Sequence, residues 1–121
     1  QVLLAEPGRV HLGLRRRDDL LQFSGAVHGG VIAGLADHAA GGAVTTLLPN
    51  GRIGVTVDLT ITFIAPANGE LIVAKATALN VGSTIATATV EIESHNGDTA
   101  DRCAFSVVTL RSVSLPAPGG S

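Results

Sequence analysis

The segment from Gly29 to Leu48 most constrains the fold, because its apolar residues follow a helical period over the length of a long helix. They recur at steps of three and four residues, at Val31, Ile32, Leu35, Ala36, Ala39, Ala43, Val44 and Leu47. A Pro-Asn-Gly turn then ends the pattern. The segment also holds four interior glycines, each of which costs a helix roughly 0.5–1 kcal/mol relative to alanine. We therefore expect one long helix that other parts of the backbone approach closely.

Extended segments lie on both sides of this helix. Residues Gly8 to Arg17 alternate apolar and polar side chains, which predicts a first strand. Four further strands are predicted after the helix, at Val55 to Phe63, Glu70 to Asn80, Ser83 to Ser94 and Thr99 to Val113. This order predicts a single α+β domain over residues 1–121, in which an antiparallel sheet wraps the helix. Residues 115–121 are rich in proline and glycine, and we expect a disordered tail there.

Asp37 is the leading candidate for a residue that does chemistry. It is the only carboxylate between Asp19 and Asp58, and it interrupts the apolar helical pattern. An ionised carboxylate is costly to desolvate unless it is paired, hydrogen-bonded or open to a solvent-filled cleft. The alternative is an ordinary aspartate on the exposed edge of a half-buried helix.

The composition argues against several classes of function. The net charge is -2, and with three Phe and no Trp or Tyr the chain lacks aromatic platforms for bases, so we expect no nucleic-acid partner. The four scattered His, without clustered carboxylates, argue against a metal site. The chain has no run of about 20 apolar residues, so we expect no membrane span. The single cysteine, Cys103, fits a reducing compartment, and we expect a cytoplasmic protein without a membrane partner.

The densest motif runs from Gln22 to Asp37, with His28-Gly29-Gly30 at its centre, and continues from Gly54 to Pro66. It resembles the hotdog-fold acyl-CoA thioesterases, in particular the phenylacetate-pathway (PaaI-like) branch. The resemblance implies an antiparallel sheet of about five to six strands around one long central helix. It also implies an acyl-CoA substrate and no cofactor, since coenzyme A is part of the substrate.

The resemblance assigns catalytic roles within this motif. In the family the helix carboxylate is the general base or the nucleophile, which here is Asp37. The first glycine after the histidine, here Gly29, donates its backbone N–H to the thioester carbonyl. An amide side chain seven residues earlier, here Gln22, holds the substrate or the attacking water. His28 is expected to orient the loop through its ring rather than to act as a base.

Further residues are expected to contact the substrate. Gly30, in the first helical turn, offers a second backbone N–H group. Some relatives carry a hydroxyl one turn beyond the carboxylate, where this chain has Gly41, and Thr56 on the next strand is the weaker candidate for orienting the water. The turn at Gly82, Ser83 and Thr84 lies where relatives approach the pantetheine or nucleotide. Possible charge partners for the coenzyme A phosphates are Arg52, Lys75 and Arg102.

The spacing of Gly29 and Asp37 bears on the assembly. They are eight residues apart, which at 1.5 Å per residue is about 12 Å along one helix, too far for both to touch one carbonyl group. Either one of them is not catalytic, or two chains build the site. An antiparallel pair of helices about a two-fold axis would bring Gly29 of one chain toward Asp37 of the other. The resemblance implies such a shared site, in a homodimer that forms a homotetramer.

The predicted function is therefore hydrolysis of an aryl- or medium-chain acyl-CoA to the free acid and coenzyme A. One alternative is a hydratase or dehydratase of the same fold, although the context of His28 does not resemble the motifs of those families. Another is a non-catalytic acyl-CoA sensor. Known sensors attach a DNA-binding segment, and few residues precede the first predicted strand, which disfavours this reading.

Overall fold

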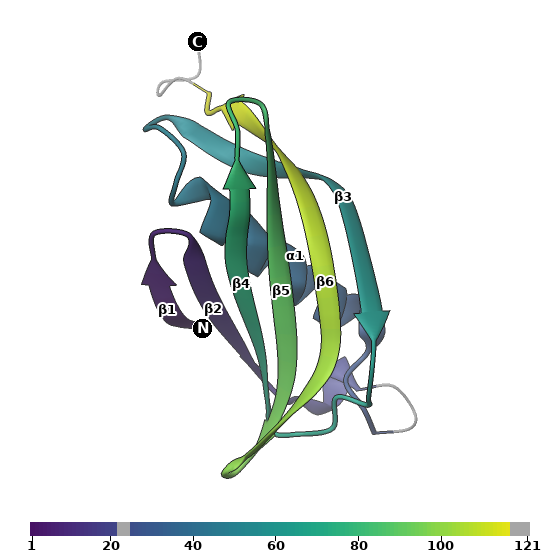
Figure 1. Ribbon diagram of the computed structural model, residues 1–121. Helices are drawn as coiled ribbons and strands as arrows, with labels where there is room; N and C mark the ends of the chain where they lie inside the picture. The colour runs from purple at the N-terminus through teal and green to yellow at the C-terminus, as the bar shows by residue number, and fades with distance from the viewer. Residues whose placement is uncertain (22–24, 117–121) are drawn as a thin grey trace.

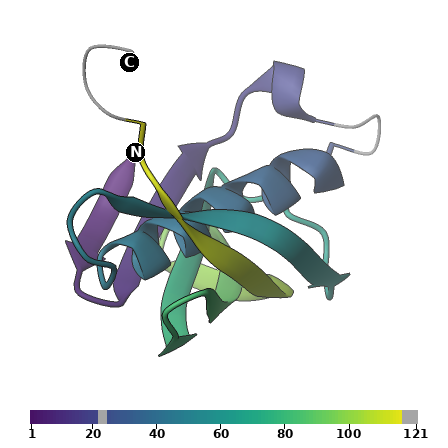
Figure 2. The same cartoon turned by 90° about the horizontal axis from the view of Figure 1, so that it is seen from above.

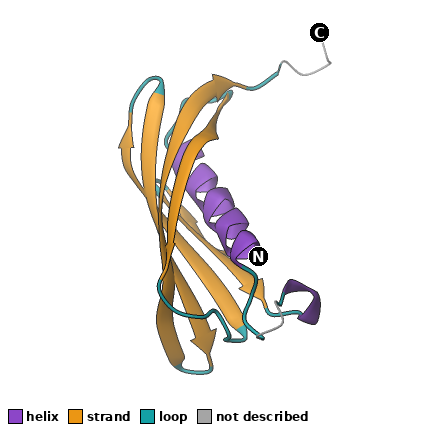
Figure 3. Ribbon diagram, turned by 90° about the vertical axis from the view of Figure 1, so that its right-hand side faces the viewer, coloured by secondary structure: helices purple, strands orange, loops and turns teal. Residues whose placement is uncertain are grey.

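The computed structural model describes residues 1–21 and 25–116. Its elements in chain order are β1 (Val2–Glu6), β2 (Arg9–Arg15), the 3-10 helix η1 (Asp18–Leu20), α1 (Gly29–Thr45), β3 (Arg52–Phe63), β4 (Leu71–Val81), β5 (Ile85–Asn96) and β6 (Thr99–Ser114). The single long helix lies across one face of a strongly twisted sheet (Figure 1). Seen from the side, the sheet curls around the helix (Figure 3). The expected hotdog fold is confirmed.

All six described strands belong to one antiparallel sheet, in the order β1-β2-β4-β5-β6-β3. The chain leaves β2, runs through α1, and returns as β3 at the far edge of the sheet. The view from above shows α1 in the hollow between β2 and β3 (Figure 2). Because β3 is an edge strand, no other described strand pairs with its second side, although the Gly54 N–H there donates to Thr45 Oγ1 over 3.1 Å.

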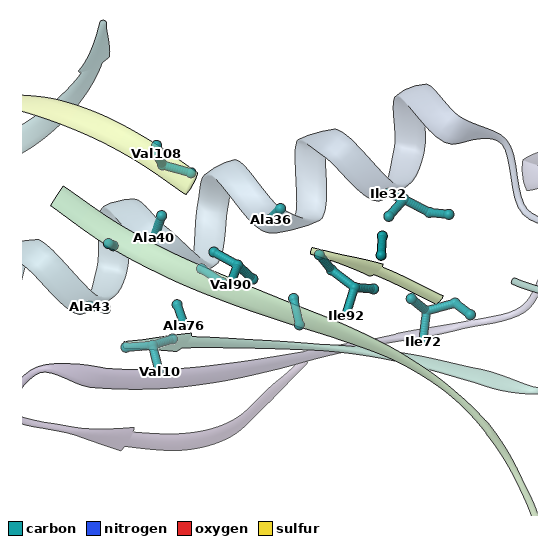
Figure 4. Close-up of a cluster of buried hydrophobic side chains, with 14 of the residues drawn as sticks. Val10, Ile32, Ala36, Ala40, Ala43, Ile72, Ala76, Val90, Ile92 and Val108 are labelled. Carbon is teal, nitrogen blue, oxygen red and sulfur yellow. The ribbon is translucent and has the colours of Figure 1, made fainter. Parts of the chain in front are cut away.

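The core lies between the helix and the concave face of the sheet, and small side chains dominate it. Ala36, Ala40 and Ala43 of α1 are fully buried. They face the inward-pointing residues of the sheet, among them Val10, Ile72, Ala76, Val90, Ile92 and Val108 (Figure 4). The two-residue period of the strands explains this, since alternate side chains of a strand point to one face.

The interior glycines of α1 do not share one role. An added Cβ at Gly42 would lie 3.4 Å from Val10 Cγ2 of β2, which is an ordinary contact with a side chain. A Cβ at Gly34 would meet nothing within 4 Å, and this residue is exposed. The surroundings of the interior glycines therefore do not support the expectation that other backbone approaches the helix closely.

The structure adds one strand and corrects two boundaries. The strand β1 was not predicted, because residues 2–5 are continuously apolar or small and show no alternation. The helix ends at Thr45 rather than Leu48, and the Thr46 hydroxyl donates to the Ala43 carbonyl oxygen over 2.6 Å at this end. The strand predicted from Val55 already begins at Arg52.

The start of the predicted tail contacts the rest of the chain. Leu115 donates its backbone N–H to the Gly51 carbonyl oxygen over 2.7 Å, so this residue is held against the turn before β3. Residues 117–121 lie outside the described part of the chain. Disorder of the remaining tail stays a prediction. In the described ranges, no helix has both the length and the apolar character needed to span a membrane.

Candidate active site

The first turn of α1 is held in place by His28. Its backbone is extended, with φ -61° and ψ 136°, as is usual for the residue that caps a helix. Its Nδ1 accepts a hydrogen bond from the Gly30 N–H over 3.3 Å. Its own backbone N–H donates to the Leu20 carbonyl oxygen over 2.8 Å, which ties the helix to the end of η1. His28 thus positions the helix start, and it occupies the N–H of Gly30, which was expected to contact the substrate.

The N–H groups of Gly29 and Gly30 differ in whether a hydrogen-bond acceptor already occupies them. Within residues 1–21 and 25–116, no hydrogen-bond acceptor is recorded for the Gly29 N–H. The Phe63 ring covers the same residue, since an added Cβ at Gly29 would lie 3.2 Å from Phe63 Cζ. The N-terminal end of a helix carries partial positive charge and unpaired N–H groups. Gly29 therefore offers a donor that suits an oxygen gaining negative charge.

A pocket of about 410 Å³ opens beside this donor. Figure 1 shows β3 ending near the first turn of α1, and the pocket lies between these two elements. Its lining residues are Ala26, Val27, Gly29, Ile32, Phe63, Ile64, Ala65, Pro66 and Ala67. A hydrogen bond of 2.8 Å from the Val27 N–H to the Ala67 carbonyl oxygen joins its two walls. Each described lining residue is a glycine or has an apolar side chain.

Asp37 lies farther along the helix, against β3. It is half-buried, and the Thr56 hydroxyl donates a hydrogen bond to its Oδ1. Thr56 faces the helix because it pairs with Leu110, next to an irregularity in the register between β3 and β6. An added Cβ at Gly41 would find only the Gly54 carbonyl oxygen, at 4.0 Å. Space therefore remains one helical turn beyond Asp37, and Thr56 supplies the hydroxyl that contacts the carboxylate.

The structure does not bring all predicted site residues together in one chain. Gly82, Ser83 and Thr84 are exposed in the hairpin between β4 and β5. This hairpin lies at the end of the sheet opposite the first turn of α1 (Figure 1). Gln22 lies outside the described residues. Sequence reasoning missed Phe63 as a neighbour of Gly29, since only the end of β3 in three dimensions reveals that contact.

The basic residues proposed for the coenzyme A phosphates all have partners within the chain. Arg52 Nε donates to Ser112 Oγ over 2.7 Å. Lys75 Nζ lies 3.0 Å from Glu93 Oε1, and Arg102 Nη2 lies 2.8 Å from Glu91 Oε1. Burial acts to raise the pKa of Glu93, but hydrogen bonds from His95 and Lys75 outweigh it and lower that pKa. These contacts give each cation a structural role.

His11 and Cys103 are not among the residues of this site, and burial changes the pKa of each. Burial, together with the charges of Arg9 and Lys75, lowers the pKa of His11. Burial raises the pKa of the Cys103 thiol, which disfavours the reactive thiolate. No group of three or more His, Cys, Asp or Glu side chains gathers within the described ranges.

Comparison with known proteins points to one family. The family model of the thioesterase superfamily matches residues 24–100. Human acyl-coenzyme A thioesterase 13 is 35% identical over 89 residues, which cover 73% of this chain and 63% of the human protein. The chain spans between 51% and 63% of the length of the curated relatives that match it.

Solved structures agree in fold. A thioesterase family protein from Silicibacter pomeroyi superposes with a TM-score of 0.92 at 26% identity, covering 94% of this chain and 84% of that protein. A mutant of the phenylacetic acid degradation protein PaaI from Thermus thermophilus superposes with a TM-score of 0.77 at 25% identity. That match covers 92% of this chain and 90% of PaaI.

Proposed function

The chain belongs to the thioesterase superfamily, and from this premise we propose that it hydrolyses an acyl-CoA thioester to the free acid and coenzyme A. The observation that carries the proposal is the pair of groups on α1. The half-buried carboxylate of Asp37 accepts a hydrogen bond from the Thr56 hydroxyl of β3, and the first N–H of the same helix borders an apolar pocket. The human relative named as an acyl-coenzyme A thioesterase supports the substrate class. The acyl group is an aryl or medium-chain group, and the reaction requires water but no cofactor.

Gly29 supplies the group that stabilises the oxyanion in this proposal. Attack on a thioester carbon turns the carbonyl oxygen into an oxyanion, and a preorganised backbone N–H lowers the energy of that state. The glycine has no Cβ between this N–H and the pocket. His28 keeps the helix start in place through Gly30, so the donor is oriented before the substrate arrives.

Asp37 supplies the base or the nucleophile. Thr56 occupies Oδ1, and the described residues give no hydrogen bond to Oδ2. As a base, the carboxylate takes a proton from water while the water oxygen attacks the thioester carbon, and the proton then passes to the departing thiolate. As a nucleophile, it attacks the same carbon, expels the thiolate and forms an anhydride that water hydrolyses. The same contact with Thr56 orients the carboxylate in both routes.

The separation of the two groups requires a second copy of the chain. Gly29 and Asp37 lie about 12 Å apart along α1, so one thioester cannot contact both within a protomer. The edge strand β3 offers a surface for association, with Val55 and Val57 exposed by 43% and 55%. Pairing of two β3 edges about a two-fold axis would continue the sheet and place the helices antiparallel. Gly29 of one protomer would then face the partner's Asp37.

Replacement of the carboxylate tests the central role of Asp37. Asp37→Asn keeps the shape of the side chain but removes its basicity, and kcat should fall by at least about 10²-fold. Thiol release from a panel of acyl-CoAs measures this, with the signal of Cys103 subtracted and the melting temperature recorded for both proteins. Undiminished turnover in the variant would rule out Asp37 as the base or the nucleophile. Tight acyl-CoA binding without turnover by the wild type would instead favour a sensor.

The backbone donor can be removed selectively because Gly29 is the first residue of α1. Proline is tolerated at that position and lacks the N–H, and the extended backbone of His28 is compatible with a following proline. Gly29→Pro should lower kcat by roughly 10²- to 10³-fold relative to Gly29→Ala. The alanine variant is the matched control, since it adds the same Cβ near Phe63 and keeps the N–H. Equal kcat values for the two variants would exclude Gly29 as the donor.

Two substitutions separate the effect of the Thr56 hydroxyl from the effect of the size of the side chain. Thr56→Val removes the donor to Asp37 with little change in volume, whereas Thr56→Ser retains a hydroxyl. Loss of a hydrogen bond to a charged group predicts a kcat lower by roughly 10- to 100-fold for the valine variant, with KM little changed. The serine variant should stay close to the wild type. A valine variant with wild-type kcat would show that the contact does not position the carboxylate.

A further inference from the structure

Two large, half-exposed side chains, Phe63 and Ile64, line the pocket beside Gly29, and Phe63 is the one whose ring lies against Gly29. Phe63 is the last residue of β3 and is 52% exposed. It pairs with Ala104 across the sheet, on the side that faces the helix. Directly after it, the Ile64 N–H donates to the Cys103 carbonyl oxygen over 2.8 Å, which anchors the chain at the pocket. The Phe63 backbone is therefore fixed while its ring borders the opening.

The ring lies beside the residue that carries the proposed oxyanion donor. The position of a Cβ on Gly29 would be 3.2 Å from Phe63 Cζ and 3.5 Å from Cε1. A thioester carbonyl that accepts from the Gly29 N–H must therefore lie within reach of this ring. One of the two substituents on the carbonyl carbon then enters the pocket, and the other points out of it.

The chemistry of the walls decides which substituent enters. The described lining side chains carry no hydrogen-bonding or charged groups. Pantetheine has two amides and leads to a diphosphate, and burying such groups without partners is costly. An apolar acyl group gains from leaving water in the same place. The pocket volume of about 410 Å³ is near the lower end of the range of about 300–1,000 Å³ for ligand pockets, which favours a compact acyl group.

We infer that Phe63 is a specificity-determining residue, whose ring limits the size of the acyl group that the pocket accepts. This inference rests on the proposed function, since it places the thioester at Gly29. The wild type should hydrolyse compact apolar acyl groups, such as phenylacetyl or medium-length straight chains, in preference to long chains. A single methylene that fits or fails to fit an apolar pocket changes kcat/KM by roughly 10- to 200-fold.

The test compares chain-length profiles of the wild type, Phe63→Leu and Phe63→Ala. The kcat/KM values are measured for straight-chain acyl-CoAs of increasing length and for phenylacetyl-CoA. The ratio of kcat/KM for the first rejected chain length to that for the best substrate should rise at least about 10-fold in Phe63→Ala. Phe63→Leu, which keeps an apolar side chain at the end of β3, should give an intermediate shift. Leu79→Ala is the control, because Leu79 is 62% exposed on β4 and does not line the pocket.

A binding measurement separates failure of this inference from failure of the proposed function. Dissociation constants of non-hydrolysable thioether analogues of the same acyl-CoAs are measured by calorimetry for each protein. Wild-type turnover with the same length profile in Phe63→Ala would overturn the inference and leave the thioesterase intact. No wild-type turnover would refute the proposed function, while a shifted length profile in the dissociation constants would still support Phe63 as the limit. An unshifted profile in both readouts would overturn the inference in either case.

Discussion

The rest of the structure depends on the close packing of the alanine face of α1 in the hollow of the sheet. Ala36, Ala40 and Ala43 have no exposed surface, so the helix axis lies near the strands and cannot shift without overlap. This contact fixes which strand residue each helix residue meets. It places the Phe63 ring against Gly29 and the Thr56 hydroxyl against Asp37. The helix thus holds the proposed donor, Gly29, at its end and the proposed base, Asp37, in its middle at a constant separation.

That constant separation shapes the proposed chemistry. A helix of this kind is rigid, so one protomer cannot bend to bring its own two groups to one thioester. The fold leaves β3 as an edge strand beside both groups, so a second copy can complete the site where the sheet is unpaired. Activity would then depend on assembly, because a monomer would contain only two separate halves of different sites.

The sequence predicted the helix and five of the described strands because their apolar periods are clear, and the motif is the basis for proposing Asp37 and Gly29 as site residues. It missed β1, whose continuously apolar residues show no period. Periodicity also shows which face a residue occupies but not which partner it meets. The contacts of Phe63 with Gly29 and of Thr56 with Asp37 depend on the registers of distant strands, including the irregularity after Thr56. Those contacts required the structure.

The most direct test of a site built from two chains is to mix Gly29→Pro and Asp37→Asn protomers. Each homodimer should be inactive, whereas a hybrid dimer should hold one site with both defects and one intact site. Random exchange at equal concentrations makes half of the dimers hybrids, so we predict recovery of about a quarter of wild-type turnover. Native mass spectrometry of isotope-labelled protomers would verify the exchange. Hybrid dimers that form without any recovered thiol release would contradict the shared site.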